Sequence, residues 1–185
     1  YKKNNANAEH PYDLTASVVN PGFDLCNANG YEVSGKSAFS QGAVEFFNTP
    51  YELSQTVSGL STGSYRVTMQ ARSGEGDANT SMQLFATASG STSTAAVKGA
   101  TRADGSDVTQ HLRQNADDFL DNPDADLVSV DIYVTSGSIT FGSRCQSASN
   151  WCVIGGFTLQ YMGKDASLMP TQWASLVEQA KTLVE

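Results

Sequence analysis

Four residues of types that bind sugars lie at the ends of predicted strands: Tyr51, Arg72, Arg144 and Trp151. An aromatic ring stacks on the C–H groups of a sugar, and a guanidinium binds hydroxyl oxygens through planar N–H donors. Each residue has a structural alternative. Trp151 can fill the end of a core, Tyr51 opens a strand, and both arginines can form ion pairs with nearby aspartates.

A second group of chemically capable residues is a run of acids within ten positions: Asp117, Asp118, Asp121, Asp124 and Asp126. Carboxylates this dense can bind a cation, but the spacing and the glycine of an EF-hand loop are absent. We favour a solvated loop that follows a short helix.

The cysteines are Cys26, Cys145 and Cys152, so at most one internal disulfide can form. Cys145 and Cys152 flank a six-residue connection, and we predict a disulfide between them in an oxidising compartment. Strand alternation argues against this pairing. Cys145 shares a strand phase with Ile139 and Phe141, whereas Cys152 shares one with Ile154 but not with Phe157. If Phe157 and Leu159 point inward, the two cysteines face opposite sides unless a bulge intervenes. Cys26 is the alternative partner for either.

No catalytic motif is present. The sequence lacks G-x-S-x-G and H-E-x-x-H, and neither His10 nor His111 lies at ligand spacing from a cysteine. A hydrolase with two carboxylates is disfavoured, because no acid stands out in an apolar, pKa-raising segment. We therefore predict that the protein is not an enzyme.

The elements that position these residues are predicted β-strands. The clearest alternation runs from Tyr65 to Arg72, with Tyr65, Val67 and Met69 on one face. Gly-rich or Pro-containing turns separate the strands, and their spacing is typical of a sandwich or barrel. Eight strands are expected, near 43–48, 51–58, 65–72, 80–88, 93–101, 128–134, 139–141 and 152–161.

Strand order also predicts where a ligand binds. If consecutive strands are antiparallel, the short connections 59–63, 89–92 and 136–137 gather at one end of the sandwich. The connections 48–50, 73–79, 102–126 and 146–151 gather at the other end. Because binding sites are usually built on loops held by a rigid scaffold, we expect a glycan at this second end.

Two segments have helical rather than strand spacing. Residues 107–120 predict a short helix inside a long loop, and Pro170 begins an amphipathic stripe that runs to the C-terminus. The expected organisation is a polar tail at 1–11, a β-sandwich at 12–163 and a helix at 164–185. That helix either starts a following module or packs on the sandwich.

Composition narrows the function further. The 185 residues carry 11 Lys+Arg against 19 Asp+Glu, a net charge of −8 and a pI near 4.6. This charge repels phosphate backbones and anionic lipids, so we expect no nucleic-acid partner and no membrane insertion. Few charges with many Ser, Thr and Gly residues are typical of a secreted or surface β protein. The expected location is extracellular, cell-surface or periplasmic.

Several segments together resemble a jelly-roll domain of Bacteroidetes surface and secreted proteins, within the galactose-binding-domain-like group that includes many carbohydrate-binding modules. They lie at 13–24, 51–72, 115–134, 136–144 and 150–163, in the order of the family. The most specific is QTVSGLSTGSYR at 55–66. The resemblance implies a jelly-roll antiparallel β-sandwich that is usually non-catalytic and joined to neighbouring domains of the same polypeptide.

One departure from the family concerns calcium. Relatives often carry an aspartate in the final strand at a structural calcium site, and here Gly155 stands at that position. Asp24 remains as a possible ligand. Because calcium needs six to eight oxygen ligands, we expect no cofactor and regard structural calcium as doubtful.

Together these observations predict a non-catalytic carbohydrate-binding-type module that binds a glycan partner through Trp151, Arg144, Arg72 and Tyr51. The alternative is a structural or adhesive surface domain with no glycan site. Exposure of Trp151 around a polar pocket would favour the first prediction.

Overall fold

A computed structural model of the chain describes residues 3–40, 42–73, 81–97, 126–135, 137–147, 151–165 and 167. Two short 3-10 turns lie near the N-terminus, η1 (Lys3–Asn5) and η2 (Thr15–Ser17). The strands are β1 (Tyr12–Asp13), β2 (Glu32–Ser34), β3 (Ser37–Ser40), β4 (Ala43–Phe47), β5 (Tyr51–Leu60), β6 (Gly63–Ser73), β7 (Gln83–Ala88), β8 (Ser91–Ala96), β9 (Leu127–Val134), β10 (Gly137–Cys145) and β11 (Trp151–Tyr161).

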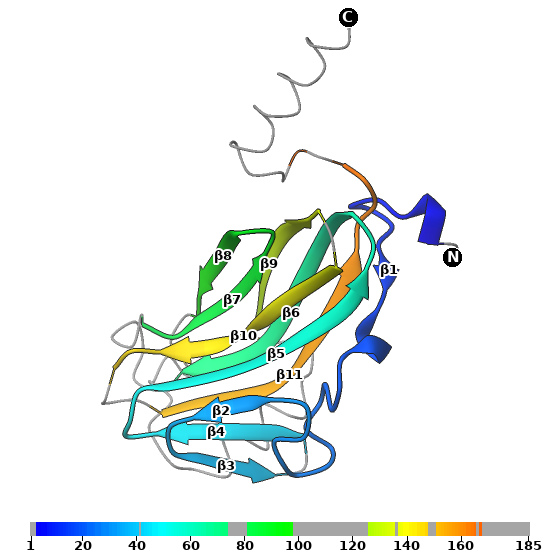
Figure 1. The fold of residues 1–185 in the computed structure, drawn as a ribbon. Helices are drawn as coiled ribbons and strands as arrows, with labels where there is room; N and C mark the ends of the chain where they lie inside the picture. The colour runs from blue at the N-terminus through cyan, green and yellow to red at the C-terminus, as the bar shows by residue number, and fades with distance from the viewer. Residues whose placement is uncertain are drawn as a thin grey trace, which may run out of the picture.

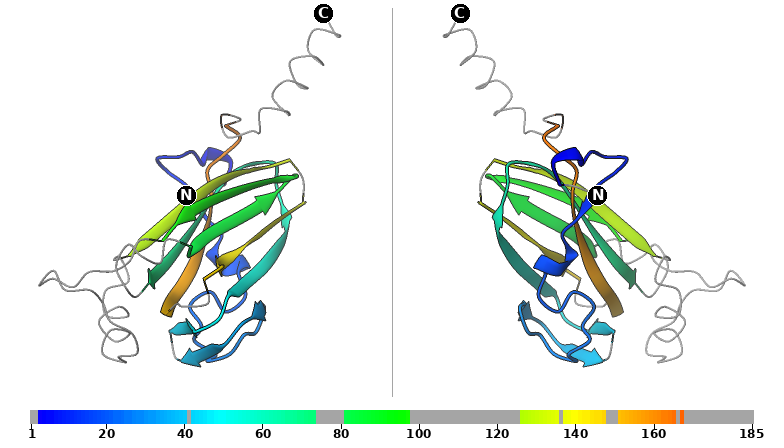
Figure 2. Two further views of the ribbon diagram at one scale, coloured as in Figure 1. Left: turned by 90° about the vertical axis from the view of Figure 1, so that its left-hand side faces the viewer. Right: turned by 90° about the vertical axis from the view of Figure 1, so that its right-hand side faces the viewer.

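The strands form two antiparallel sheets that pack face to face (Figures 1 and 2). Sheet A has the order β3-β4-β11-β6-β9, with β1 also paired to β11, and sheet B has the order β2-β5-β10-β7-β8. The predicted all-β jelly-roll sandwich is therefore confirmed. The eight expected strands are β4 to β11, and the segment 12–40 adds β1, β2 and β3, which are too short to show alternation.

The core lies between the sheets because each long strand buries one face. On β6 the side chains of Tyr65, Val67 and Met69 are all 0% exposed, as are Ile139 and Phe141 on β10. Full burial of one such side chain contributes about 1.5–3 kcal/mol relative to exposure. The residues between them on each strand point outward, so each sheet presents an outer face to solvent.

Hydrogen bonds tie the short connections together at one end. The Thr62 hydroxyl donates to the Thr135 carbonyl at 2.6 Å, and the Thr135 N–H donates to the Ser89 hydroxyl at 2.9 Å. These residues follow β5, β9 and β7 respectively, so the predicted gathering of the short connections at one end is confirmed, whereas most of the loops predicted for the other end lie outside the described residues. Strands β4, β6, β8 and β10 all end at the opposite end of the sandwich, which we call the loop-rich end.

A β-bulge in β11 decides which side chains of this strand enter the core. The register of β11 against β6 shifts between Ile154 and Gly156. The extra residue inverts the alternation, so that Cys152, at 0% exposure, and Phe157, at 2%, both face inward. Sequence analysis predicts that Cys145 and Cys152 face the same side only if a bulge intervenes. This bulge meets that condition, and both cysteines face the core. Both are buried thiols in the structure and Cys26 is an exposed one, so the predicted Cys145–Cys152 disulfide is not formed.

The two predicted helices, at 107–120 and in the C-terminal segment, fall outside the described residues, as do Asp117, Asp118, Asp121 and Asp124. No helix in the described part of the chain is long and apolar enough to cross a membrane.

Candidate functional site

The four predicted ligand residues do not converge on one site. Tyr51 lies in the core, Arg72 and Trp151 lie on the outer face of sheet A, and Arg144 lies on the outer face of sheet B. The four residues therefore cannot contact one sugar together, although sequence analysis expected them to.

Tyr51 is a core residue. Its ring is 3% exposed and stacks on Phe46 with ring centroids 3.9 Å apart and an interplanar angle of 10°. Its hydroxyl lies 2.9 Å from the Ser143 hydroxyl. Tyr51 therefore has no open face for a sugar, because it follows the inward phase of β5.

Trp151 is also buried, at 1% exposure. It belongs to a small apolar cluster with Ala43 and Val153, against which Phe47 packs. This cluster is separate from the core between the sheets. The exposure of Trp151 that would favour a glycan site is thus not observed, and its indole is part of an apolar cluster, which is the structural alternative for this residue.

Arg72 forms an ion pair. Its Nε and Nη2 atoms donate to Oδ2 of Asp126 at 3.0 and 2.6 Å. Asp126 is the only member of the acidic run that the structure describes, and it precedes β9, which pairs with β6. The structure therefore shows the alternative role of Arg72, a contact with the Asp-rich segment.

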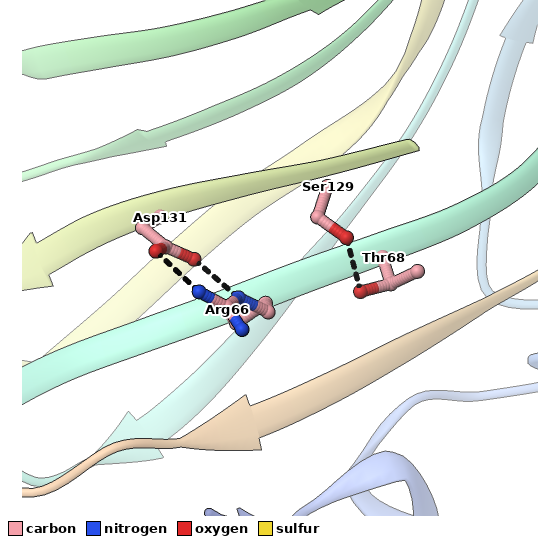
Figure 3. Close-up of polar contacts among 4 residues, drawn as sticks. All are labelled: Arg66, Thr68, Ser129 and Asp131. Carbon is pink, nitrogen blue, oxygen red and sulfur yellow. Dashed lines mark hydrogen bonds and ion pairs between the residues drawn. The ribbon is translucent and has the colours of Figure 1, made fainter. Parts of the chain in front are cut away.

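Two further cross-strand pairs lie on the β6–β9 outer face, as Figure 3 shows. Arg66 donates to both carboxylate oxygens of Asp131 at 2.7 and 2.8 Å, and the hydroxyls of Thr68 and Ser129 lie 2.8 Å apart. The hydrogen bonds to Asp131 raise the pKa of Arg66 above its usual value. These groups bind one another across adjacent strands.

Arg144 lies in a different environment, on the outer face of sheet B. Its guanidinium carbon is 5.0 Å from the centre of the Phe85 ring, a cation–π contact. Strand register places Arg144 opposite Glu52 of β5 on one side and opposite Gln83 of β7 on the other. Ser34 of β2 pairs with Glu52, so one row of polar residues crosses four strands.

The next row of this face contains a gap. Gly142 lies between Ser54 and Phe85 in register and carries no side chain. A Cβ atom at Gly142 would collide with the Leu53 carbonyl oxygen, so the close approach of β10 to β5 requires glycine. Where these two rows reach β2 and β5, the surface has a recess of about 240 Å³ that is lined by Glu32, Ser34 and Glu52.

We call this surface the Arg144 face, made of Glu32, Ser34, Glu52, Ser54, Gln83, Phe85 and Arg144. Among the described residues, no hydrogen bond or ion pair occupies the guanidinium of Arg144, the amide of Gln83 or the carboxylates of Glu32 and Glu52. Glu32 and Glu52 are exposed, Gln83 and Arg144 are half-buried, and Ser54 and Phe85 are buried between them, close to the loop-rich end of the sheet.

Sequence analysis identified only Arg144 on this face. In 83–88 the apolar run Leu84, Phe85 and Ala86 shows no alternation, and Phe85 is 5% exposed, so its place on the outer face is not visible in the sequence. The position of Gln83 and Phe85 next to Arg144 is not visible either, because it depends on which strands pair and in which register.

The residues around Asp24 do not fit a calcium site. Asp24 is exposed and lies beside Gly155 and Gly156, which have no side chains to offer. Within the described residues, no three His, Cys, Asp or Glu side chains gather in one place. One carboxylate is far from the six to eight oxygens that calcium takes.

No protein-family model and no curated protein sequence matches the chain. Among solved structures it is similar to a family 61 carbohydrate-binding module in complex with β-1,4-galactotriose, at 22% identity over 76% of this chain and 94% of that chain, with a TM-score of 0.47. It is also similar to a family 35 carbohydrate-binding module from Cellvibrio japonicus, at 14% identity over 73% and 91% of the two chains, with a TM-score of 0.45.

A third similar structure is the enzymatically active domain of tailspike protein 4 from bacteriophage CBA120. The identity is 9%, the coverage is 77% of this chain and 21% of that chain, and the TM-score is 0.51. At this identity the likeness concerns the fold alone.

Proposed function

We propose that the chain is a non-catalytic domain of an exported protein that binds a neutral glycan across the Arg144 face. The observation that carries the proposal is a set of planar polar groups on one face of a rigid sheet that have no hydrogen-bond or ion-pair partner among the described residues. Guanidinium, amide and carboxylate groups bind pairs of sugar hydroxyls, and strands hold them at fixed spacing.

The charge of the site supports a neutral ligand. Arg144 is accompanied by two carboxylates, those of Glu32 and Glu52, on a chain of net charge −8. A uronic acid or a sulfated sugar would meet like charge at both acids. An uncharged hydroxyl donates to a carboxylate without that repulsion.

The openness of the face supports binding rather than catalysis. Electrostatic catalysis acts best in a site that excludes water, whereas these groups lie on an outer sheet face beside a small recess. Neighbouring domains of the same polypeptide, as the family resemblance implies, would then supply any activity.

The test is native affinity electrophoresis of the purified chain in gels that contain soluble galactan, galactomannan, xylan or mixed-linkage β-glucan. We expect at least one polysaccharide to retard the chain. Calorimetry with β-1,4-galactotriose and cellotriose then measures affinity for defined probes.

Arg144→Ala should weaken the interaction about tenfold or more, because it removes charge-assisted hydrogen bonds of about 1.5–3 kcal/mol. Arg66→Ala is the matched control, since Arg66 lies on the outer face of sheet A and pairs with Asp131. Equal affinity of the Arg144 and Arg66 variants would overturn the site. Absence of retardation in all four gels would favour a structural or adhesive domain.

A further inference from the structure

A cleft of about 350 Å³ lies on the outer face of sheet A, on the opposite side of the sandwich from the Arg144 face. Strand register aligns Gly156 of β11, Gln70 of β6 and Leu127 of β9 across its floor. The segment that contains Pro21 and Asp24 borders the cleft beside β11.

The bulge in β11 creates the cleft. The Phe157 N–H donates to the Pro21 carbonyl at 2.9 Å, which holds the loop against the strand. Gly156 has φ of +150°, and a Cβ atom there would lie 2.8 Å from the Pro21 carbonyl oxygen. Only glycine allows this approach, and the absence of side chains at Gly155 and Gly156 leaves the space open.

The lining combines hydroxyl-binding groups with apolar surface. In the described part of the chain, the Asp24 carboxylate and the Thr158 hydroxyl have no hydrogen-bond partner. Thr68 and Thr15 also line the cleft, but their hydroxyls already bond the Ser129 hydroxyl and the Leu159 N–H. Leu127 is 51% exposed at the same cleft and supplies an apolar surface.

We infer that this cleft is a second glycan subsite, which takes one neutral sugar residue. Asp24 and Thr158 bind its hydroxyls, and Leu127 packs against a C–H face of the ring. Asp24 disfavours a uronic acid, because two carboxylates repel each other. The ligand class rests on the proposed function, but the cleft and the Arg144 face are independent sites. Because they lie on opposite faces, they would contact different glycan chains.

The test is a titration of the ¹⁵N-labelled chain with D-galactose, D-glucose, D-mannose or D-xylose, followed by the backbone amide signals. At least one of these sugars should shift the Gly156 and Thr158 signals with a saturable curve, and D-glucuronate should shift them far less. Thr158→Val should weaken this interaction about fivefold, the loss expected for one hydrogen bond. Thr92→Val, an outer-face substitution on sheet B, is the control and should leave it unchanged.

Three results would overturn the inference: no response of the Gly156 and Thr158 signals to any of the four neutral sugars, equal affinities of the Thr158 and Thr92 variants, or a response of the cleft to calcium chloride alone. Failure of the proposed function is recognised separately. If only the proposed function is wrong, no polysaccharide binds at the Arg144 face but the Gly156 and Thr158 signals still respond to sugar. If only the cleft inference is wrong, these signals do not respond, but polysaccharide still retards the chain and the retardation still depends on Arg144.

Discussion

Cys145 and Cys152 face each other across the core, Cys145 on β10 of sheet B and Cys152 on β11 of sheet A, with their thiols in hydrogen-bond contact. The hydrogen bond with Cys145, together with burial, raises the pKa of the Cys152 thiol far above its usual range. A thiol that stays protonated and buried is a poor nucleophile. Cys152 is therefore a poor nucleophile in the folded protein, and Cys145 is likewise shielded by burial.

We expect a thiol reagent such as Ellman's reagent to modify one cysteine per native chain, because Cys26 is exposed and the other two are buried. If folding in an oxidising compartment joins Cys145 to Cys152, the denatured chain also shows one reactive thiol, and three after reduction. Peptide mapping identifies the bridge. Native modification of all three thiols would contradict the burial, and a bridge that contains Cys26 would contradict the pairing.

Stability should fall at alkaline pH. Burial raises the pKa of Tyr65 to about 12, against an ordinary value near 10. Because the folded state holds Tyr65 neutral, its contribution to stability is fully present below pH 10 and is lost as the pH rises through about 12. Burial also raises the pKa of Tyr51 and Tyr31, which adds to the effect in the same direction. Urea unfolding from pH 7 to pH 12 measures it.

Tyr65→Phe separates this titration from the hydrogen bond of the same residue. The Tyr65 hydroxyl donates to the Ser61 carbonyl at 2.7 Å, so the variant should lose about 1 kcal/mol at pH 7. Since phenylalanine cannot ionise, the difference from wild type should shrink toward pH 12. A constant difference across the pH range would contradict the assigned role.

Gly142→Ala should destabilise the fold by about 2 kcal/mol or more, because its Cβ would collide with the backbone of β5. Gly90→Ala is the control. Gly90 has φ of +77° but open space around it, so the substitution there should cost about 1 kcal/mol. Thermal or chemical unfolding of both variants gives the comparison. Equal losses would mean that β10 can move away from β5 without penalty.

Chelation should leave the melting temperature nearly unchanged. Asp24 is the carboxylate at the position where the family resemblance expects calcium, and its neighbours Gly155 and Gly156 offer no side-chain oxygen. A bound cation stabilises the folded state by mass action, so its removal would lower the melting temperature. A fall of more than a few degrees with EDTA would reveal a cation that the fold depends on.

The sequence alone determines the fold class and the division of the sandwich into two ends. Alternation such as that of Tyr65, Val67 and Met69 is local, because side chains on a strand point to opposite faces with period two. Short turns near Thr62, Ser89 and Thr135 then force the strands to alternate in direction. Both features need only neighbouring residues, and the structure agrees with the fold class and with the gathering of the short turns at one end.

Tertiary structure decided the site. Trp151 was expected near a ligand, yet its burial depends on Ala43 and Phe47, about a hundred residues earlier in the chain. The bulge at Gly156 inverts the phase of β11, and the register of β10 with β5 and β7 places Arg144 beside Glu52 and Gln83. These contacts join residues far apart in sequence, so no local pattern encodes them. They follow from strand pairing, which packing of the whole core selects.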